Sequence, residues 1–295
     1  AGLNLLVNRI LPYAMRALPT DLLAIAAWAM TEPKQAVERL LQMAGNSSPL
    51  LPLVVWQVAA HCPDTAFLEA DIASSSPHTL HDACREALSA PVDTQNAEAL
   101  LLRFLGLEAY ASVFGADEKT HEALDALQKN LRPKNVLRQD AFSGKQVMCL
   151  AALAFPEDDA LMQRIQALPV SGRTYTMEDA LAAAALASAG RWRAAWEHIP
   201  AADAMYASAG TAALAYMTIM EGLLGMEWNG NTLALHAHVP EAWDSLTLTL
   251  HAGASTWHVE AARAIRQASC DGEKAADPIA IHDDGHIHQV RFPLN

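Results

Sequence analysis

The chain has 295 residues, 52% of them hydrophobic and 18% charged, a composition that excludes intrinsic disorder. Its formal net charge of -13, from 33 acidic and 20 basic residues, argues against nucleic acid and anionic membrane surfaces as partners. No signal peptide and no apolar run of about 18 residues is found, so we expect no direct membrane insertion. The four cysteines form no CxxC pair, which indicates a reducing, cytoplasmic location.

Up to Gly225 the sequence predicts one helix after another. Apolar residues recur at helical spacing, as in Leu100, Leu101 and Phe104, and proline or glycine interrupts the pattern at short intervals. The chain begins at Ala1 without a methionine and already inside a helical pattern, which suggests a fragment or processed part of a longer protein.

Helix-start signals support this organisation. They include Thr20-Asp21, Thr31-Glu32-Pro33, and Thr176 followed by Asp179 at the spacing of a capping box. We count about twelve helices with short loops, and predict a mainly α fold with an (α/α)6-barrel-like helical toroid over residues 1–225. An open superhelix is the alternative, but no repeat of fixed period is found.

After Gly225 the pattern changes to period two. "NTLALHAHV" and "LTLTLHAG" alternate polar and apolar residues, as strands do. "WNGN", "HAGAS", "CDGE" and "DDG" are typical of hairpin turns. We therefore predict a small C-terminal antiparallel β-domain over residues 226–295, packed on the helices.

Histidines and aspartates gather near the end of the chain. His282, Asp283, Asp284, His286 and His288 lie within seven positions and could ligate a metal ion. In a hairpin that turns at Asp284-Gly285, two of the histidines share one strand face, but nothing orients the other groups towards them. We therefore expect no metal site and no cofactor.

Catalytic motifs are missing from the sequence. No GxSxG, P-loop, HExxH or GxGxxG is found. Asp93, Asp140 and Glu178 are weak candidates for catalytic carboxylates, because glycoside cleavage needs two carboxyls roughly 5 Å or 6.5–9.5 Å apart across a cleft. Trp192 and Trp196 could stack on sugars, although aromatic residues at helical spacing more often belong to a core.

A small-residue turn, Ser208-Ala209-Gly210-Thr211, opens the helix within "YASAGTAALAYMTIMEGLLG". Such turns often bind anions, because free amides and the helix dipole point at the ligand. The polar partners of an anion site are few here, so we interpret the turn as the remnant of a phosphate site.

The C-terminal third resembles one enzyme family. "EGLLGMEWNGNTLALHAHVPEAWDSLTLTLHAGASTWHVE", together with "CDGE" and "IAIHDDGHIHQVRF", resembles the end of glycoside hydrolase family 94, the inverting β-glucoside phosphorylases and the phosphorylase region of cyclic β-1,2-glucan synthases. "FSGKQVMCLAALAFPED", "TLHDACREAL" and "SPLLPLVVWQVAAHCPDTAFLE" resemble earlier family segments more faintly. The resemblance implies an (α/α)6 barrel, in agreement with the helices counted from the pattern.

Departures from the family pattern fall on its catalytic residues. The phosphate-binding threonine, glycine and serine positions of the family are Ala209, Gly210 and Thr211 here, and its histidine position is Gly144. The loop that carries the family's general acid is reduced to "APVDTQ", in which Asp93 is the one carboxylate. Because methyl groups and hydrogens cannot donate to phosphate, conventional phosphorolysis is not expected.

We therefore interpret the chain as a catalytically degenerate glucan-phosphorylase-like domain. It would bind a β-glucan or another oligosaccharide, or scaffold a polysaccharide-synthase assembly, including one with a membrane anchor. The candidate substrate-binding residues are Arg191, Trp192, Trp196, Tyr206, Gly210 and Thr211. Two alternatives stay open: an active carbohydrate enzyme (hydrolase, transglycosylase or phosphorylase) with a rearranged site, and a purely structural oligomerisation domain.

Overall fold

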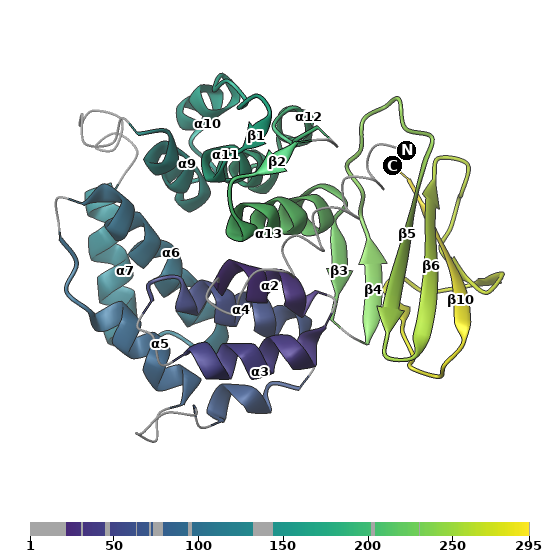
Figure 1. Cartoon of the computed structure of the whole chain (residues 1–295), viewed down its shortest axis with the longest axis horizontal. Coiled ribbons are helices and arrows are strands. Elements are labelled where there is room, and N and C mark those ends of the chain that lie inside the picture. The colour runs from purple at the N-terminus through teal and green to yellow at the C-terminus, as the bar shows by residue number, and fades with distance from the viewer. Residues whose placement is uncertain are drawn as a thin grey trace.

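The computed structural model describes residues 22–30, 32–44, 48–62, 64–70, 72, 79–93, 96–131, 144–201, 204–229 and 231–294. It is mainly helical, with a smaller, largely antiparallel sheet region beside the helices (Figure 1), which confirms the predicted class. Any helix before residue 22, the start signal Thr20-Asp21 and the candidate Asp140 lie outside the described residues. Within these ranges, no helix has the length and apolar character needed to cross a membrane.

The helical region occupies the chain up to Leu223. Its helices are α2 (Leu22–Ala29), α3 (Pro33–Met43), α4 (Leu51–His61), the 3-10 turn η1 (Ala66–Glu69), α5 (Leu80–Ser89), α6 (Ala97–Phe114), α7 (Glu118–Leu131), α9 (Lys145–Ala154), α10 (Asp159–Gln166), α11 (Met177–Ser188), α12 (Trp192–Glu197), α13 (Ala209–Met217) and the π-helix η3 (Thr218–Leu223). Two short parallel strands, β1 (Thr174–Tyr175) and β2 (Met205–Tyr206), also occur in this region and were not predicted.

Local sequence signals explain several helix starts. The predicted capping box is present at α11, where the Thr176 hydroxyl accepts from the Asp179 amide and the Asp179 carboxylate accepts from the Thr176 amide. Pro33 stands at the start of α3, as predicted. At α11 a free amide is thus satisfied by a side chain next to it in the sequence, whereas α3 has no side-chain cap and begins with a residue that lacks an amide proton.

Six of the helices contact one another in succession. α2 contacts α4, α4 contacts α6, α6 contacts α9, α9 contacts α11, α11 contacts α13, and α13 contacts α2. The helices α3, α5, α7, α10 and α12 each contact one or two members of this set. Among the α-helices that the structure describes, members of this set therefore alternate along the chain with helices outside it.

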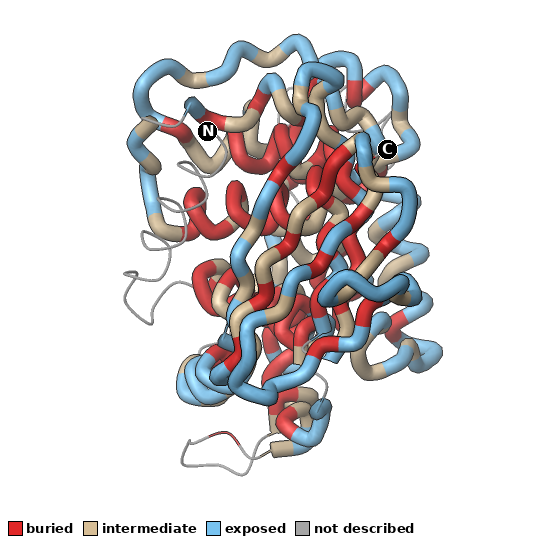
Figure 2. The backbone as a smooth tube through the Cα atoms, turned by 90° about the vertical axis from the view of Figure 1, so that its right-hand side faces the viewer, coloured by how far each residue is buried: buried red, intermediate tan, exposed pale blue. Residues whose placement is uncertain are grey.

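The C-terminal strands form two sheets. A three-stranded sheet has the order β3-β4-β9 and a five-stranded sheet the order β5-β6-β10-β7-β8. Their bounds are β3 (Met226–Trp228), β4 (Thr232–Leu235), β5 (Ser245–Ala252), β6 (Ser255–Ala262), β7 (Ser269–Cys270), β8 (Glu273–Lys274), β9 (Ile279–Ala280) and β10 (Ile287–Pro293). Buried and partly buried residues alternate along most of β6, as the period-two pattern predicts, and Figure 2 shows the burial of the strands along the backbone.

Three of the four predicted hairpins are present: β3–β4, β5–β6 and β7–β8. The prediction of a hairpin at Asp284-Gly285 is wrong, because β9 pairs with β4 whereas β10 pairs with β6 in parallel and with β7. The segment crosses between the two sheets, and the amides of Asp284 and Gly285 donate to Ser255 Oγ at 2.8 Å each. A side chain of the neighbouring turn thus fixes a segment that local sequence alone assigns to a hairpin.

The helices and the sheets share a continuous core. One cluster of buried residues includes Val58 of α4 and Leu224 together with Leu233 of β4 and Phe292 of β10. A second cluster lies within the helical region, among α6, α9, α10 and α11.

The chain passes from helix to strand at Gly225. This residue has φ +54°, and a Cβ placed there would lie 2.5 Å from the carbonyl oxygen of His236. The His236 amide donates to the Gly225 carbonyl at 3.0 Å, and the His238 amide donates to Leu223 at 2.8 Å. Glycine is required here because β4 returns directly against the turn.

Candidate functional site

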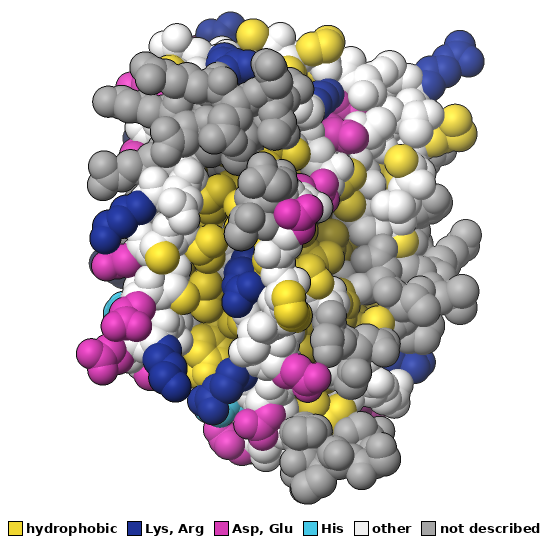
Figure 3. All heavy atoms as spheres, turned by 90° about the vertical axis from the view of Figure 1, so that its left-hand side faces the viewer, with side chains coloured by type: hydrophobic (Ala, Val, Ile, Leu, Met, Phe, Trp, Pro, Cys, Tyr) yellow, Lys and Arg dark blue, Asp and Glu magenta, His cyan; other side chains and the backbone are white. Residues whose placement is uncertain are grey.

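A cavity of about 700 Å³ lies among the successive helices; we call it the central cavity. Side chains from α2, α4, α6, α9, α11, α12, α13 and the π-helix line it, and most are aliphatic, such as Leu23, Leu53, Leu102, Leu150, Leu181 and Leu214. Its polar lining residues are Gln57, Glu98, Gln146, Ser188, Thr218 and Glu221. On the side of the molecule where α7 lies, hydrophobic side chains gather in hollows of the surface (Figure 3).

The π-helix forms one wall of the cavity. The Leu224 amide donates to the carbonyl of Ile219, five residues earlier, at 2.8 Å. Gly222 lets this wall approach α11 closely, since a Cβ on it would lie 3.1 Å from the Cβ of Ala187. Single-turn π-helices frequently occur at functional sites, because they redirect side chains within a helix.

Glu221 of the π-helix is bound by two side chains of α4. The Gln57 amide donates to Glu221 Oε1 at 2.5 Å, and His61 Nε2 lies 2.5 Å from the same oxygen. His61 is 3% exposed, and its Nδ1 lies 2.5 Å from the carbonyl oxygen of Trp228, so both ring nitrogens face oxygen acceptors. Since Gln57 and His61 are four residues apart on one helix face, they reach the carboxylate together.

A second carboxylate lies between α6 and α9. The Gln146 amide donates to Glu98 Oε1 at 2.7 Å, and both residues line the cavity. Each cavity carboxylate is therefore already bound by a glutamine amide from a neighbouring helix.

Thr218 contributes a hydroxyl to the cavity lining. Its side chain is 5% exposed, and Oγ1 has no hydrogen-bond partner among the described residues. An unpaired buried hydroxyl costs roughly 1–3 kcal/mol, so a partner supplied from within the cavity would be favourable.

Of the predicted sugar-stacking residues, one lines the cavity. Trp192 does so, and its ring stacks on His238 with centroids 4.1 Å apart. Trp196 instead donates its indole N–H to the His238 carbonyl at 2.6 Å and lies 5.3 Å from the ring of Trp243. The Trp196 ring thus joins α12 to the segment after β4.

Two further predicted substrate-binding residues, Arg191 and Tyr206, make contacts within the protein. The Arg191 guanidinium forms an ion pair with Asp159 of α10 at 2.6 Å. The Tyr206 ring lies edge-on to Tyr175, with centroids 5.9 Å apart, where β2 pairs with β1. Neither residue is among the described residues that line the central cavity.

The small-residue turn is capped by its own first residue. The Thr211 amide donates to Ser208 Oγ at 3.0 Å, and the hydroxyls of the two residues lie 2.9 Å apart. Gly210 and Thr211 are both buried in the first turn of α13. The side chain of Ser208 thus takes one of the amides that a phosphate would need.

The two described carboxylate candidates lie away from the central cavity lining. Asp93 is exposed in the loop after α5 and lines a smaller cavity of about 380 Å³. Glu178 lies in the first turn of α11, where its backbone carbonyl accepts from the Cys149 thiol at 3.6 Å. No described pair of these candidates faces one cleft.

The structure identifies polar residues that sequence reasoning missed. Glu221 stands first in "EGLLG", a segment quoted for the family resemblance but not assigned a role. Gln57 and His61 carry a weak signal, since two polar residues four apart interrupt an apolar helix. Glu98 and Gln146 carry no signal, because their pairing depends on how α6 and α9 approach.

No protein-family model matches the chain, and no curated protein is significantly similar to it. The functional argument therefore rests on the central cavity and its polar groups.

Proposed function

We propose that the chain is a non-catalytic binding domain that takes a small amphipathic molecule into the central cavity. The observation that carries the proposal is a cavity of about 700 Å³ with an aliphatic lining and few polar groups. Pockets for small molecules typically measure roughly 300–1,000 Å³ and combine an apolar lining with a few placed polar groups. In a purely structural domain, side chains would be expected to fill such a space.

We further propose that the helices close into an (α/α)6-type toroid around this cavity. The succession of contacts from α2 through α4, α6, α9, α11 and α13 back to α2 supports a closed ring of six. All six also line the cavity, which would then lie along the axis of the ring. The resemblance to glycoside hydrolase family 94 favours the same architecture.

The absence of catalysis is proposed from the polar groups of the cavity. Glu98 and Glu221 each accept a hydrogen bond from a glutamine amide, and Glu221 also pairs with His61, contacts that hold both carboxylates against the wall of the cavity. Gly144, at the family's phosphate-ligand position, is the N-cap of α9 and has no side chain to donate. Both observations support a binding role.

The lining also limits the chemistry of the ligand. Each buried methylene contributes about 0.8 kcal/mol, which favours an alkyl chain against the leucines. A sugar unit would instead bury hydroxyls without partners, at roughly 1–3 kcal/mol each. Because the polar lining offers two carboxylates and the Thr218 hydroxyl, a head group that donates hydrogen bonds fits better than an anionic one.

The test is displacement of N-phenyl-1-naphthylamine, whose fluorescence rises in apolar sites, by decanol, decylamine and decanoate. We expect one dye per chain, displaced by the alcohol and the amine at concentrations about tenfold or more below decanoate, a difference of about 1.4 kcal/mol. Ala184→Trp, which places an indole in the cavity, should abolish binding, whereas Ala160→Trp on the exposed side of α10 should not. Absence of binding, or equal binding by both variants, would contradict the proposal.

One observation favours a second candidate, non-catalytic binding of a β-glucan within a polysaccharide-synthesis assembly. Trp56 lines the cavity and is 43% exposed, so its ring could stack on a sugar at the entrance. Calorimetric titration with β-1,2- and β-1,4-gluco-oligosaccharides, with and without phosphate, tests this candidate. Binding that Trp56→Ala removes would support it, and release of glucose 1-phosphate would overturn both binding roles.

A further inference from the structure

A second group of polar side chains lies on the five-stranded sheet, where β7 pairs with β10. None of its residues lines the central cavity. The group comprises Cys270 and Asp271, at the β7–β8 turn, and His288 of β10. We propose that these three residues form a binding site for a divalent transition metal ion, with Zn²⁺ as the best fit. The site is independent of the proposed cavity function.

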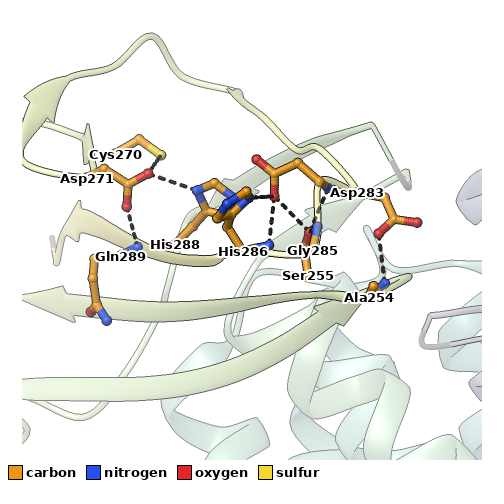
Figure 4. A network of polar contacts seen from close by, with 10 residues as sticks. Ala254, Ser255, Cys270, Asp271, Asp283, Gly285, His286, His288 and Gln289 are labelled. Atoms are coloured by element: carbon orange, nitrogen blue, oxygen red, sulfur yellow. Dashed lines mark hydrogen bonds and ion pairs between the residues drawn. The ribbon is translucent and has the colours of Figure 1, made fainter.

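Strand pairing brings the three residues together. β7 runs antiparallel to β10 with Cys270 opposite Val290, two residues from His288 on the same strand face. Figure 4 shows the Asp271 carboxylate and the Cys270 thiol facing the His288 ring. The sulfur, one carboxylate oxygen and one ring nitrogen all lie within 4.8 Å of one another.

The distances approach those of a tetrahedral site. His288 Nδ1 lies 2.8 Å from Asp271 Oδ2, and Cys270 Sγ lies 3.8 Å from the same oxygen. With metal–ligand bonds of about 2.0–2.3 Å, the edges of a zinc tetrahedron measure about 3.3–3.6 Å. His288 Nδ1 and Asp271 Oδ2 lie about half an ångström closer than such an edge, and Cys270 Sγ lies near the edge length from that oxygen, so side-chain movement alone would bring the three atoms around one ion.

The ligands are held in place by groups that would not touch the metal. Asp271 Oδ1 accepts the Gln289 amide at 2.7 Å, which leaves Oδ2 directed at the site. His288 Nε2 lies 3.1 Å from Asp284 Oδ1, so Nδ1 is the nitrogen left for the metal. Metal-binding histidines commonly donate their second N–H to a carboxylate in this way, which fixes the ring and raises its basicity.

This supporting carboxylate is itself anchored. Asp284 Oδ1 accepts from the His286 amide at 3.0 Å and from the Ser255 hydroxyl at 3.1 Å. The His288 ring stacks on Trp257, with centroids 4.0 Å apart, and Trp257 is 1% exposed. The histidine therefore has a packed face on one side and a fixed carboxylate at Nε2.

The donor set selects the metal. A thiolate, an imidazole and a carboxylate together suit Zn²⁺ and its Co²⁺ substitute, whereas Mg²⁺ and Ca²⁺ prefer oxygen ligands alone. On binding, the ion replaces the thiol proton of Cys270 and the proton at Nδ1 of His288, and both protons pass to solvent. The three protein ligands leave a fourth position for water.

The sequence analysis predicted no metal site because it considered as ligands only residues between His282 and His288. It considered residues 282–288 as one hairpin, in which Asp283 and His282 had no reason to approach His288. In the structure Asp283 Oδ1 instead accepts the Ala254 amide at 2.7 Å. The two additional ligands come from β7 and its turn, which only the sheet register brings near.

The test is a titration of the whole chain with Co²⁺ and Zn²⁺. We expect one Co²⁺ per chain, with a thiolate-to-cobalt absorption band in the near ultraviolet that Zn²⁺ abolishes. Cys270→Ser should remove the band, and Asp284→Asn should weaken Zn²⁺ binding about 10- to 100-fold through the loss of the supporting carboxylate. Cys62→Ser, which removes another partly exposed free thiol, is the matched control and should change neither result.

Circular dichroism of each variant separates loss of binding from loss of fold. No thiolate band in the folded parent chain, or a band of equal strength in a folded Cys270→Ser variant, would overturn the proposal. So would loss of the band in folded Cys62→Ser.

Discussion

A buried hydroxyl occurs in each region of the molecule, and the two are in opposite situations. Thr218, in the helical region, lines the central cavity and has no partner among the described residues. Ser255, in the sheet region, is 0% exposed, accepts from two backbone amides and donates to the Asp284 carboxylate.

The difference extends to the polar groups around them. In the helical region, contacts such as Gln57–Glu221 join residues 164 positions apart and border an open space. In the sheet region, residues of two turns 29 positions apart satisfy one another, as in Ala254–Asp283 and Ser255–Asp284. Thus the sheet uses its polar groups to fix its own backbone, whereas the helices leave polar groups facing a cavity that a ligand can enter.

The largest effect is expected at the junction of the two regions. Gly225→Ala should lower the free energy of unfolding by about 3 kcal/mol, because it adds both left-handed backbone strain and a clash with His236. Gly272→Ala, at φ +86° with nothing within 4 Å, should cost only about 1 kcal/mol. Urea unfolding measures both; equal costs would show that the junction tolerates movement of β4.

The next largest effect is expected from acid, which should lower the stability of the helical region by protonating Asp179. The Asp179 side chain is 0% exposed, and burial alone would raise its pKa, but hydrogen bonds from Lys145, Ser171 and Thr176 outweigh burial and lower the pKa to about 2. A lowered pKa stabilises the fold above the unfolded value of about 3.9, and this stabilisation is lost as the pH falls towards 2.

Asp179→Asn should therefore lower the free energy of unfolding by about 2 kcal/mol at pH 7, and the difference from the parent chain should vanish near pH 2. Exposed Asp125→Asn on α7 is the control and should change stability by less than about 0.5 kcal/mol. A deficit that persists unchanged at low pH would mean that the Asp179 charge is not the stabilising feature.

The two buried hydroxyls give the next pair of tests. Ser255→Ala should lower the free energy of unfolding by about 2 kcal/mol, because the amides of Asp284 and Gly285 lose their acceptor. Thermal or urea unfolding measures the change. An effect below about 0.5 kcal/mol would mean that water replaces the hydroxyl, and the contrast between the regions would fail.

Thr218→Val keeps the shape of the side chain and removes the unpaired hydroxyl. It should raise the free energy of unfolding by about 1 kcal/mol. If Thr218→Val instead lowered the free energy of unfolding by about 1 kcal/mol, the Thr218 hydroxyl would have a hydrogen-bond partner, such as a water molecule in the cavity. The contrast between the Thr218 and Ser255 hydroxyls would then fail.

Helix starts, strand alternation and three hairpin turns were predictable because each depends on neighbouring residues. The capping box at Thr176 and Asp179 needs only a spacing of three, and the β5–β6 hairpin needs only "HAGAS" between alternating strands. The parallel pairing of β10 with β6 was not predictable, because it depends on contacts of Ser255 with a segment about 30 residues later.

In the candidate site, too, features that depend on neighbouring residues were predictable and those that depend on contacts between distant segments were not. Trp192 was predicted as a ligand contact and does line the cavity, but Arg191 and Trp196, its neighbours within one helical turn, make contacts inside the protein. Sequence spacing places residues on one helix and does not tell which face another helix covers. The Glu98–Gln146 pair depends wholly on such an approach.

The shared core also bears on how such a chain can be inherited or recombined. Leu224 and Val58 from the helices pack in one cluster with Leu233 and Phe292 from the sheets. If the chain were divided at Gly225, each of the two parts would expose to water the residues that it contributes to this cluster. A chimaera that takes its C-terminal strands from a related protein should therefore fold only when the facing residues of α4 and the π-helix come from that protein as well.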